Sequence, residues 1–128
     1  MSNVSRLVEI YIDFGLARST ALILAVLTFY AINKYVSMKD LARLTGLSKS
    51  SLSIRLRDLV NMGIVESRRW GKSKLYRLRR DGITNLLKNR IMEFFKRVEL
   101  LADSLNDVVL RNDLKRFDLN IKELLDKV

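Results

Sequence analysis

The sequence predicts a mainly α-helical fold with one small β-hairpin, and three observations lead to this prediction. Most of the chain carries apolar residues at the three- and four-residue spacings of amphipathic helices. After Gly63 the pattern changes to alternating polar and apolar residues over two short stretches, as in strands. Proline is absent, and the five glycines fall between these segments, where they mark the ends of elements. A length of 128 residues is that of one domain.

Two helices are expected in the first quarter of the chain. The first has apolar residues at i, i+3, i+4 and i+7 and ends near Gly15; these residues are Val4, Leu7, Val8 and Tyr11. Residues 20–32 are apolar on every face, which predicts a helix buried in the core with Ser19 or Thr20 as its N-cap. That segment is too short for the roughly 20 residues of a membrane crossing, and no signal peptide precedes it, so we expect a cytoplasmic protein.

A short helix, a turn and a longer helix are predicted next. Ser37 and Asp40 have the S-x-x-D spacing of a capping box, and the short helix runs to about Leu44. After the turn at 45–47, Ser48 is expected to cap a helix that continues to Met62. Its core face is formed by Leu52, Leu56 and Leu59.

The opposite face of the longer helix has an unusual composition. It consists of Ser50, Ile54, Arg57 and Asn61, flanked by Ser51 and Ser53. An exposed Ile54 could contact a thymine methyl group in a major groove, and small serines allow the backbone to approach base edges. The alternative is a single stray apolar residue on the surface, which is common.

Residues 64–70 and 74–79 are predicted to form a β-hairpin joined by Gly71, Lys72 and Ser73, with Tyr76 and Leu78 turned toward the core. Its tip and flanks are strongly basic, with Arg68, Arg69, Lys72, Lys74, Arg77 and Arg79. Such a hairpin is suited to contacting phosphates. The alternative is an edge protected by charge against aggregation.

The charge distribution points to a polyanionic partner. The net charge is +10, and residues 39–80 hold twelve Lys or Arg against three acids, whereas the remainder of the chain is almost balanced. A concentrated excess of this kind is the footprint of a nucleic acid or, less often, an anionic membrane. The chain has no cysteine and no histidine, which excludes disulfides, structural zinc and a histidine base. No cofactor motif occurs, so we expect neither a cofactor nor enzymatic activity.

Helix, turn, helix and basic hairpin in this order is the arrangement of a winged helix-turn-helix. The stretches GLARSTA at 15–21, DLA at 40–42, GLSKSSLS at 46–53, LRDL at 56–59 and GIV at 63–65 resemble the MarR superfamily, with its GbsR-like branch the closest. The resemblance covers about residues 10–80. It implies a cytoplasmic, dimeric transcription regulator in which residues 48–57 are the recognition helix and residues 70–74 the wing. The hairpin is shorter than the usual wing and the C-terminal region differs, so sensing of a small-molecule effector is left open.

The candidate DNA contacts follow from this assignment and from the residue chemistry. In the recognition helix they are Ser48, Lys49, Ser50, Ser51, Ser53, Ile54, Arg55 and Arg57. In the wing they are Arg68, Arg69, Trp70, Lys72, Ser73 and Lys74.

The segment after Gly82 carries a heptad pattern typical of a coiled coil, and it predicts a single helix that needs a partner. The candidate dimer interface is Leu87, Ile91, Phe94, Val98, Leu101, Leu105 and Val108. Three further apolar residues, Phe95, Ala102 and Val109, widen this stripe. We therefore expect a bundle in which the helix packs on its symmetry mate and on the N-terminal helices, parallel or antiparallel. The alternative is a helix folded back on its own domain. Asp118 is expected to cap a last short helix.

Together these observations predict a winged helix-turn-helix DNA-binding domain over residues 1–82 and a helical dimerisation region over residues 83–128. The expected function is that of a dimeric, nucleoid-associated transcription regulator that reads double-stranded DNA. The alternative is a small architectural chromatin protein that binds DNA through phosphates with little sequence specificity. The sequence favours no membrane partner.

Overall fold

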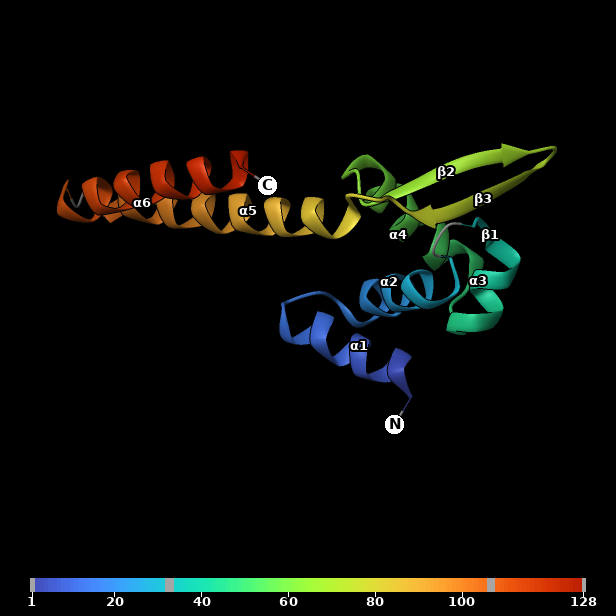
Figure 1. Ribbon diagram of the computed structural model, residues 1–128. Coiled ribbons are helices and arrows are strands. Elements are labelled where there is room, and N and C mark those ends of the chain that lie inside the picture. Colours follow the sequence, from blue (N-terminus) through green and yellow to red (C-terminus); the bar gives the residue numbers. More distant parts are fainter. Residues whose placement is uncertain (1, 32–33, 106–107, 128) are drawn as a thin grey trace. The chain divides into compact units, whose positions relative to one another are not determined.

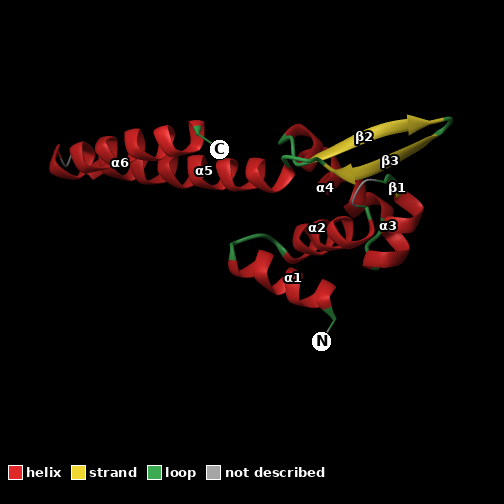
Figure 2. Cartoon of the chain, in the orientation of Figure 1, coloured by secondary structure: helices red, strands yellow, loops and turns green. Residues whose placement is uncertain are grey.

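A computed structural model of the protein describes residues 2–31, 34–105 and 108–127 (Figures 1 and 2). The chain divides into two compact units, Met1–Gly82 and Ile83–Val128. The first unit contains helices α1 to α4 and a small sheet, and α5 and α6 make up the second. Within the described ranges, no helix is both long and apolar enough to span a bilayer.

Helix α1 (Asn3–Asp13) confirms the first predicted helix and packs on α2. The side-chain oxygen of Ser2 caps it by accepting a hydrogen bond of 3.1 Å from the Ser5 amide. The helix buries Val8 and Tyr11, two of the four apolar residues that predicted it. These two residues hold α1 against the rest of the first unit.

Helix α2 (Arg18–Tyr30) is the buried core helix, but it starts earlier than expected. Its N-cap is Ala17, which makes no side-chain hydrogen bond, so the prediction of Ser19 or Thr20 as the cap is wrong. A side-chain cap contributes about 1 kcal/mol, less than the burial of several apolar side chains. The start of α2 therefore follows from packing, through its buried residues Ala21, Ile23, Leu24, Ala25, Val26 and Leu27.

Helix α3 (Met38–Thr45) confirms the short helix and its cap. The side-chain oxygen of Ser37 accepts a hydrogen bond of 3.1 Å from the Asp40 amide. The helix ends at Gly46, whose φ of +73° lies in the left-handed region that glycine adopts without strain. The chain thereby turns sharply into the next helix.

Helix α4 (Lys49–Asn61) begins after Ser48 as predicted, with a hydrogen bond of 3.2 Å from the Ser51 amide to the Ser48 side-chain oxygen. Its three core leucines are fully or almost fully buried: Leu52, Leu56 and Leu59. Because these leucines all lie on one face, the opposite face of α4 is turned to solvent.

The sheet has three antiparallel strands in the order β1-β3-β2: β1 (Val36–Ser37), β2 (Val65–Trp70) and β3 (Ser73–Leu78). The hairpin of β2 and β3 was predicted, whereas β1 was not, because two residues are too few to show an alternating pattern. Ser73, expected in the turn, pairs with Trp70 as the first residue of β3. The turn is therefore only two residues long.

The two sides of the sheet differ, since cross-strand partners point to the same side. Val36 and Tyr76 are paired and buried, and Val65 is buried opposite Leu78. This inner side faces the helices, as expected for Tyr76 and Leu78. The outer side faces solvent.

The peptide group of Ile64 joins several elements. Its carbonyl oxygen accepts a hydrogen bond of 2.9 Å from the Arg79 amide, and its N–H donates one of 3.0 Å to the Leu59 carbonyl oxygen. Gly82 is buried directly beside it, and a Cβ atom there would overlap the Ile64 carbonyl oxygen. The end of α4, the end of β3 and the first residue of α5 thus meet at one peptide.

The second unit is a pair of antiparallel helices, α5 (Gly82–Leu105) and α6 (Val108–Asp126) (Figure 1). The Phe95 and Phe117 rings lie 5.0 Å apart, and an Arg111 nitrogen lies 3.8 Å from an Asp103 oxygen, so the two helices are in contact. The prediction of one continuous helix through Val108 is wrong, because heptad spacing carries no information about a reversal of the chain.

Asp118 is likewise not a helix cap. It lies within α6 and pairs with Lys122 one turn later, with 3.0 Å between the ammonium nitrogen and a carboxylate oxygen. An Asp at an N-cap and an Asp in an i,i+4 pair have the same spacing to apolar neighbours, which explains the error.

Candidate nucleic-acid interface

The exposed side of α4 brings together the predicted contacts that lie farthest from the core. We call Ser50, Ser53, Ile54 and Arg57 the recognition face. All four are exposed, and Ile54 keeps 50% of its surface accessible. The buried leucines on the other side of α4 fix this face in position. A rigid helix thus presents hydroxyl groups, one apolar side chain and one guanidinium to the outside.

The other four predicted residues of this helix have different surroundings. Lys49 is exposed, whereas Ser51 and Arg55 are half-buried. Ser48 is exposed but already engaged as the N-cap, and its hydroxyl lies 3.2 Å from that of Ser50. The hydroxyl of Ser48 therefore serves to stabilise the first turn of α4.

All six predicted wing residues are exposed, and they surround the turn between β2 and β3: Arg68, Arg69, Trp70, Lys72, Ser73 and Lys74. Gly71 provides the turn with a φ of +60° and nothing lies within 4 Å of a Cβ built there. Trp70 and Ser73 are the last paired residues before the turn. The indole of Trp70 is 67% exposed, more than most apolar side chains of the chain.

The outer side of the sheet carries an alternating series of arginine and aromatic side chains that the sequence did not predict. The Arg77 guanidinium lies 4.6 Å from the centre of the Tyr35 ring. The Arg68 guanidinium lies 5.7 Å from the same ring and 5.8 Å from the Trp70 ring. We call Arg77, Tyr35, Arg68 and Trp70 the cation–π series. Such contacts depend on strand register, and no local pattern around Tyr35 indicates them.

Glu66 holds Arg77, the strand residue of this series that lies farthest from the turn. It lies across from Arg77 in the β2–β3 ladder and forms a side-chain hydrogen bond and ion pair with it. This hydrogen bond raises the pKa of Arg77 above its ordinary value, a change further supported by the Glu66 charge. Arg77 therefore stays charged and fixed beside Tyr35.

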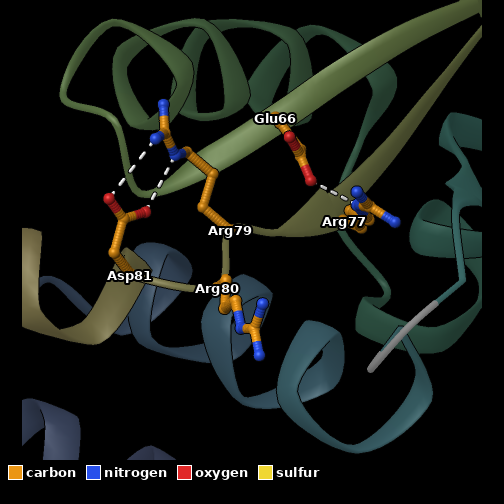
Figure 3. Close-up of a pocket in the computed structure, with 5 residues that line it drawn as sticks. All are labelled: Glu66, Arg77, Arg79, Arg80 and Asp81. Atoms are coloured by element: carbon orange, nitrogen blue, oxygen red, sulfur yellow. Dashed lines mark hydrogen bonds and ion pairs between the residues drawn. The ribbon is translucent and has the colours of Figure 1, made fainter.

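A shallow cavity of about 400 Å³ opens at the base of the hairpin (Figure 3). It is lined by Glu66, Arg77, Arg79, Arg80 and Asp81. Two ion pairs cross it: Arg77 with Glu66, and Arg79 with Asp81 at 2.9 Å between nitrogen and oxygen. Most of the charged groups that line the cavity are paired with each other. These ion pairs stabilise the base of the hairpin and leave few charges free to bind a ligand.

The unmatched positive charge lies instead on α4 and on the tip of the hairpin. In the part of the chain that the structure describes, the basic residues of the recognition helix and the wing form no ion pair: Lys49, Arg55, Arg57, Arg68, Arg69, Lys72 and Lys74. Opposite charges from a partner can therefore approach these groups directly.

The predicted dimer residues lie on both helices of the second unit. Leu87, Phe94, Leu101 and Val108 are exposed, Ile91 and Val98 are half-buried, and the side chain of Leu105 lies outside the described residues, as does that of Ala102. Phe94 and Leu101 keep 60% and 56% of their surfaces accessible. Phe95 is instead buried and contacts Phe117, while Val109 is exposed. Two helices thus leave a broad apolar surface uncovered.

Comparison with known proteins bears on both the fold and the site. Residues 14–71 match the family model described as the MarR family. They span α2, the helix-turn-helix and β2, and they include the whole recognition face. The chain has a winged helix-turn-helix fold, and its residues 14–71 are similar to the MarR family. The predicted fold class is thereby confirmed, whereas the GbsR-like branch remains a prediction.

A solved structure described as a transcriptional regulator has the same fold as this chain. The two are 18% identical, with a TM-score of 0.70 over 97% of this chain and 93% of the other. The likeness extends past the family match to α5 and α6. No curated protein matches the chain in sequence. The family match is the finding that supports a DNA-binding transcription regulator, and the solved structure shows that the fold is shared.

Proposed function

We propose that this protein is a homodimeric transcription regulator that places α4 in a major groove of double-stranded DNA and holds the phosphate backbone with its wing. One observation carries the proposal. The recognition face is fixed by buried leucines behind it, is exposed to solvent, and carries side chains suited to base edges. Residues 1–82 are the DNA-binding part in this proposal, and residues 83–128 form the dimerisation region.

The chemistry of the recognition face is suited to base readout. A guanidinium such as that of Arg57 donates two hydrogen bonds to the O6 and N7 atoms of guanine. An exposed aliphatic side chain such as Ile54 contacts the methyl group of thymine. Serine hydroxyls both donate and accept, and they are short enough for a close approach of the helix. Arg57 and Ile54 are therefore proposed to provide the specificity.

The wing has a different chemistry and a different proposed role. Arg69, Lys72 and Lys74 offer charge without a fixed geometry for base edges, so they are proposed to contact phosphates. Phosphate contacts position a protein on DNA without selecting a sequence. The wing thus contributes affinity and register.

Dimerisation is proposed through the apolar surface of α5 and α6. Exposed leucine and phenylalanine side chains on a two-helix unit gain several kcal/mol when a second copy covers them. A two-fold dimer would place two α4 helices in successive major grooves, roughly 34 Å apart. The preferred DNA is therefore expected to be a pseudo-palindrome.

The experiment compares two alanine variants on two DNA duplexes at fixed salt concentration. One duplex is selected from a random library with the wild-type protein, and the other has a random sequence. Arg57→Ala is expected to cost about 1 to 3 kcal/mol on the selected duplex and much less on the random one. Lys72→Ala is expected to weaken both alike and to lower the log–log salt slope by about one unit.

The same experiment tests the architectural alternative, which the concentration of charge on the hairpin favours. A chromatin protein would bind both duplexes with similar affinity, and the two variants would have similar effects. Equal losses for Arg57→Ala on both duplexes would remove the base-reading role. Affinity that did not change between low and physiological salt would contradict both functions.

A further inference from the structure

Trp70 has a position that its burial and packing do not explain. It is the only tryptophan of the chain, it lies beside the two-residue turn, and its indole is 67% exposed. A single exposed apolar residue is common and is not by itself a site. The surroundings of this indole carry the argument.

The first of these surroundings is the cation–π series, in which the Arg68 guanidinium restrains the indole from one face. The Arg68 guanidinium lies within 6 Å of both the Trp70 and the Tyr35 rings, and Arg77 lies against Tyr35 from the other end. Glu66 in turn holds Arg77. A flat apolar group held in one orientation loses little conformational entropy when it binds. The tip of the wing is therefore already organised.

The second is the unmatched charge around the indole. Lys72 lies in the turn, Arg68, Arg69 and Lys74 lie within three positions of it, and in the described ranges none of the four forms an ion pair. Glu66 is the one acidic side chain on this hairpin. It lies at the end away from the turn and forms an ion pair with Arg77. An apolar plane within a ring of positive charge fits a polyanion that also has apolar faces. Duplex DNA has both, in its phosphates and in its sugars and bases.

We propose that Trp70 inserts into the minor groove beside the site of α4 and acts as a wedge against the sugars and a base step, bending the duplex. This inference rests on the proposed DNA-binding function and adds a role for the wing beyond phosphate contact. Apolar wedges of this kind partly unstack a base step and bend DNA by roughly 20 to 90°. The surrounding cations neutralise the phosphates that the bend brings together.

The test uses the fluorescence of the wild-type dimer, which reports on Trp70 alone because the chain has no other tryptophan. Binding is followed separately, by the anisotropy of a dye-labelled duplex of the selected sequence. Quenching by acrylamide is then measured with and without a saturating amount of unlabelled duplex. Insertion is expected to lower the quenching constant at least roughly two-fold, since a stacked indole is removed from solvent. Energy transfer between dyes at the two duplex ends is expected to report a bend.

Three variants extend the test. Trp70→Ala is expected to weaken duplex binding about 10-fold or more, the loss typical of one stacked aromatic, and to abolish the bend. Trp70→Phe, which keeps a flat ring, is expected to retain most of both. Lys72→Ala is the matched control beside the turn: it lowers affinity and salt dependence but leaves the indole shielded and the DNA bent. Trp70 is exposed, so all three variants should keep the wild-type circular dichroism spectrum.

Each outcome is decisive. Shielding, bending and their loss in Trp70→Ala support the wedge. If the duplex binds but the indole stays open to acrylamide and Trp70→Ala binds as wild type, the wedge is wrong and the proposed regulator stands. If the duplex does not bind at all, the proposed function fails and the wedge with it. If only single-stranded DNA shields the indole, the surface is a stacking platform for unpaired bases and the minor-groove proposal is overturned.

Discussion

Ser48 supports α4 through one hydrogen bond, which its side-chain oxygen accepts from the Ser51 amide. An N-cap of this kind satisfies an amide that would otherwise lack a partner in the first turn. Because the recognition face lies on the same helix, the start of α4 affects both stability and the presentation of Ser50. The residue thus has a structural role that can be measured without DNA.

Ser48→Ala is expected to lower the free energy of unfolding by about 1 kcal/mol and the melting temperature by about 4 °C. Ser53→Ala is the matched control, since Ser53 is exposed in the interior of the same helix and alanine has the higher helix propensity. Thermal unfolding followed by circular dichroism measures both. A loss for Ser53→Ala as large as that for Ser48→Ala would contradict the capping role.

Single residues also mark how far the sequence could predict the candidate interface. The position of Ile54 on an exposed face could be predicted, because helical periodicity alone opposes it to the core leucines. Tyr35 could not, since its place beside Arg68 and Arg77 depends on how β1 pairs with β3. Contacts made across strands have no signature in a single stretch of sequence.

At the scale of the elements, the sheet makes the folding stability of the protein depend on pH in the alkaline range. Burial raises the pKa of the Tyr76 phenol above its ordinary value of 10.0. The folded state therefore keeps this proton at a pH where the unfolded chain has lost it. Stability from Tyr76 is complete below about pH 10 and falls as the pH rises through that value and above it.

Tyr76→Phe is expected to reduce the loss of stability between about pH 8 and about pH 10.5, because phenylalanine has no proton to lose. The measurement is the urea midpoint of each protein at the two pH values. Tyr30→Phe is the control at an exposed tyrosine. Lysines also titrate in this range, but they are common to all three proteins and cancel in the comparison. An unchanged difference in Tyr76→Phe would show that the phenol does not contribute.

Elements were predictable where local chemistry marks their ends. Both serine caps and the Gly46 turn of the helix-turn-helix are such marks, and both helices were confirmed. The break between α5 and α6 has no glycine or proline, and the heptad pattern continues across it. The start of α2 failed for another reason, because burial of its apolar face outweighed the available caps. Tertiary packing thus decided where α2 starts.

At the scale of the whole molecule, the exposed apolar residues of α5 allow a direct test of the proposed dimer. Leu101→Asp is expected to convert the proposed dimer into a monomer of about 14.9 kDa. A carboxylate buried in an apolar interface costs several kcal/mol, whereas on an exposed surface it costs little. Light scattering coupled to gel filtration measures the mass.

Lys96→Asp introduces the same carboxylate on α5 but away from the heptad residues, so it should leave the dimer intact. Tight binding to the selected duplex should be lost only in Leu101→Asp. If that variant keeps the mass of a dimer, the apolar surface of α5 and α6 is not where two copies meet.

The packing of Gly82 on the Ile64 carbonyl has a consequence for how substitutions in this chain are tolerated. Selection at position 82 acts on the absence of a side chain, since every other residue brings a Cβ atom into an occupied space. The position would therefore stay glycine in functional descendants of this sequence, whatever DNA they recognise. Arg57 and Ile54, by contrast, would be free to change with the DNA sequence if they read base edges as proposed. The constraint on position 82 thus comes from the geometry of the backbone and is separate from any constraint that DNA recognition would place on α4.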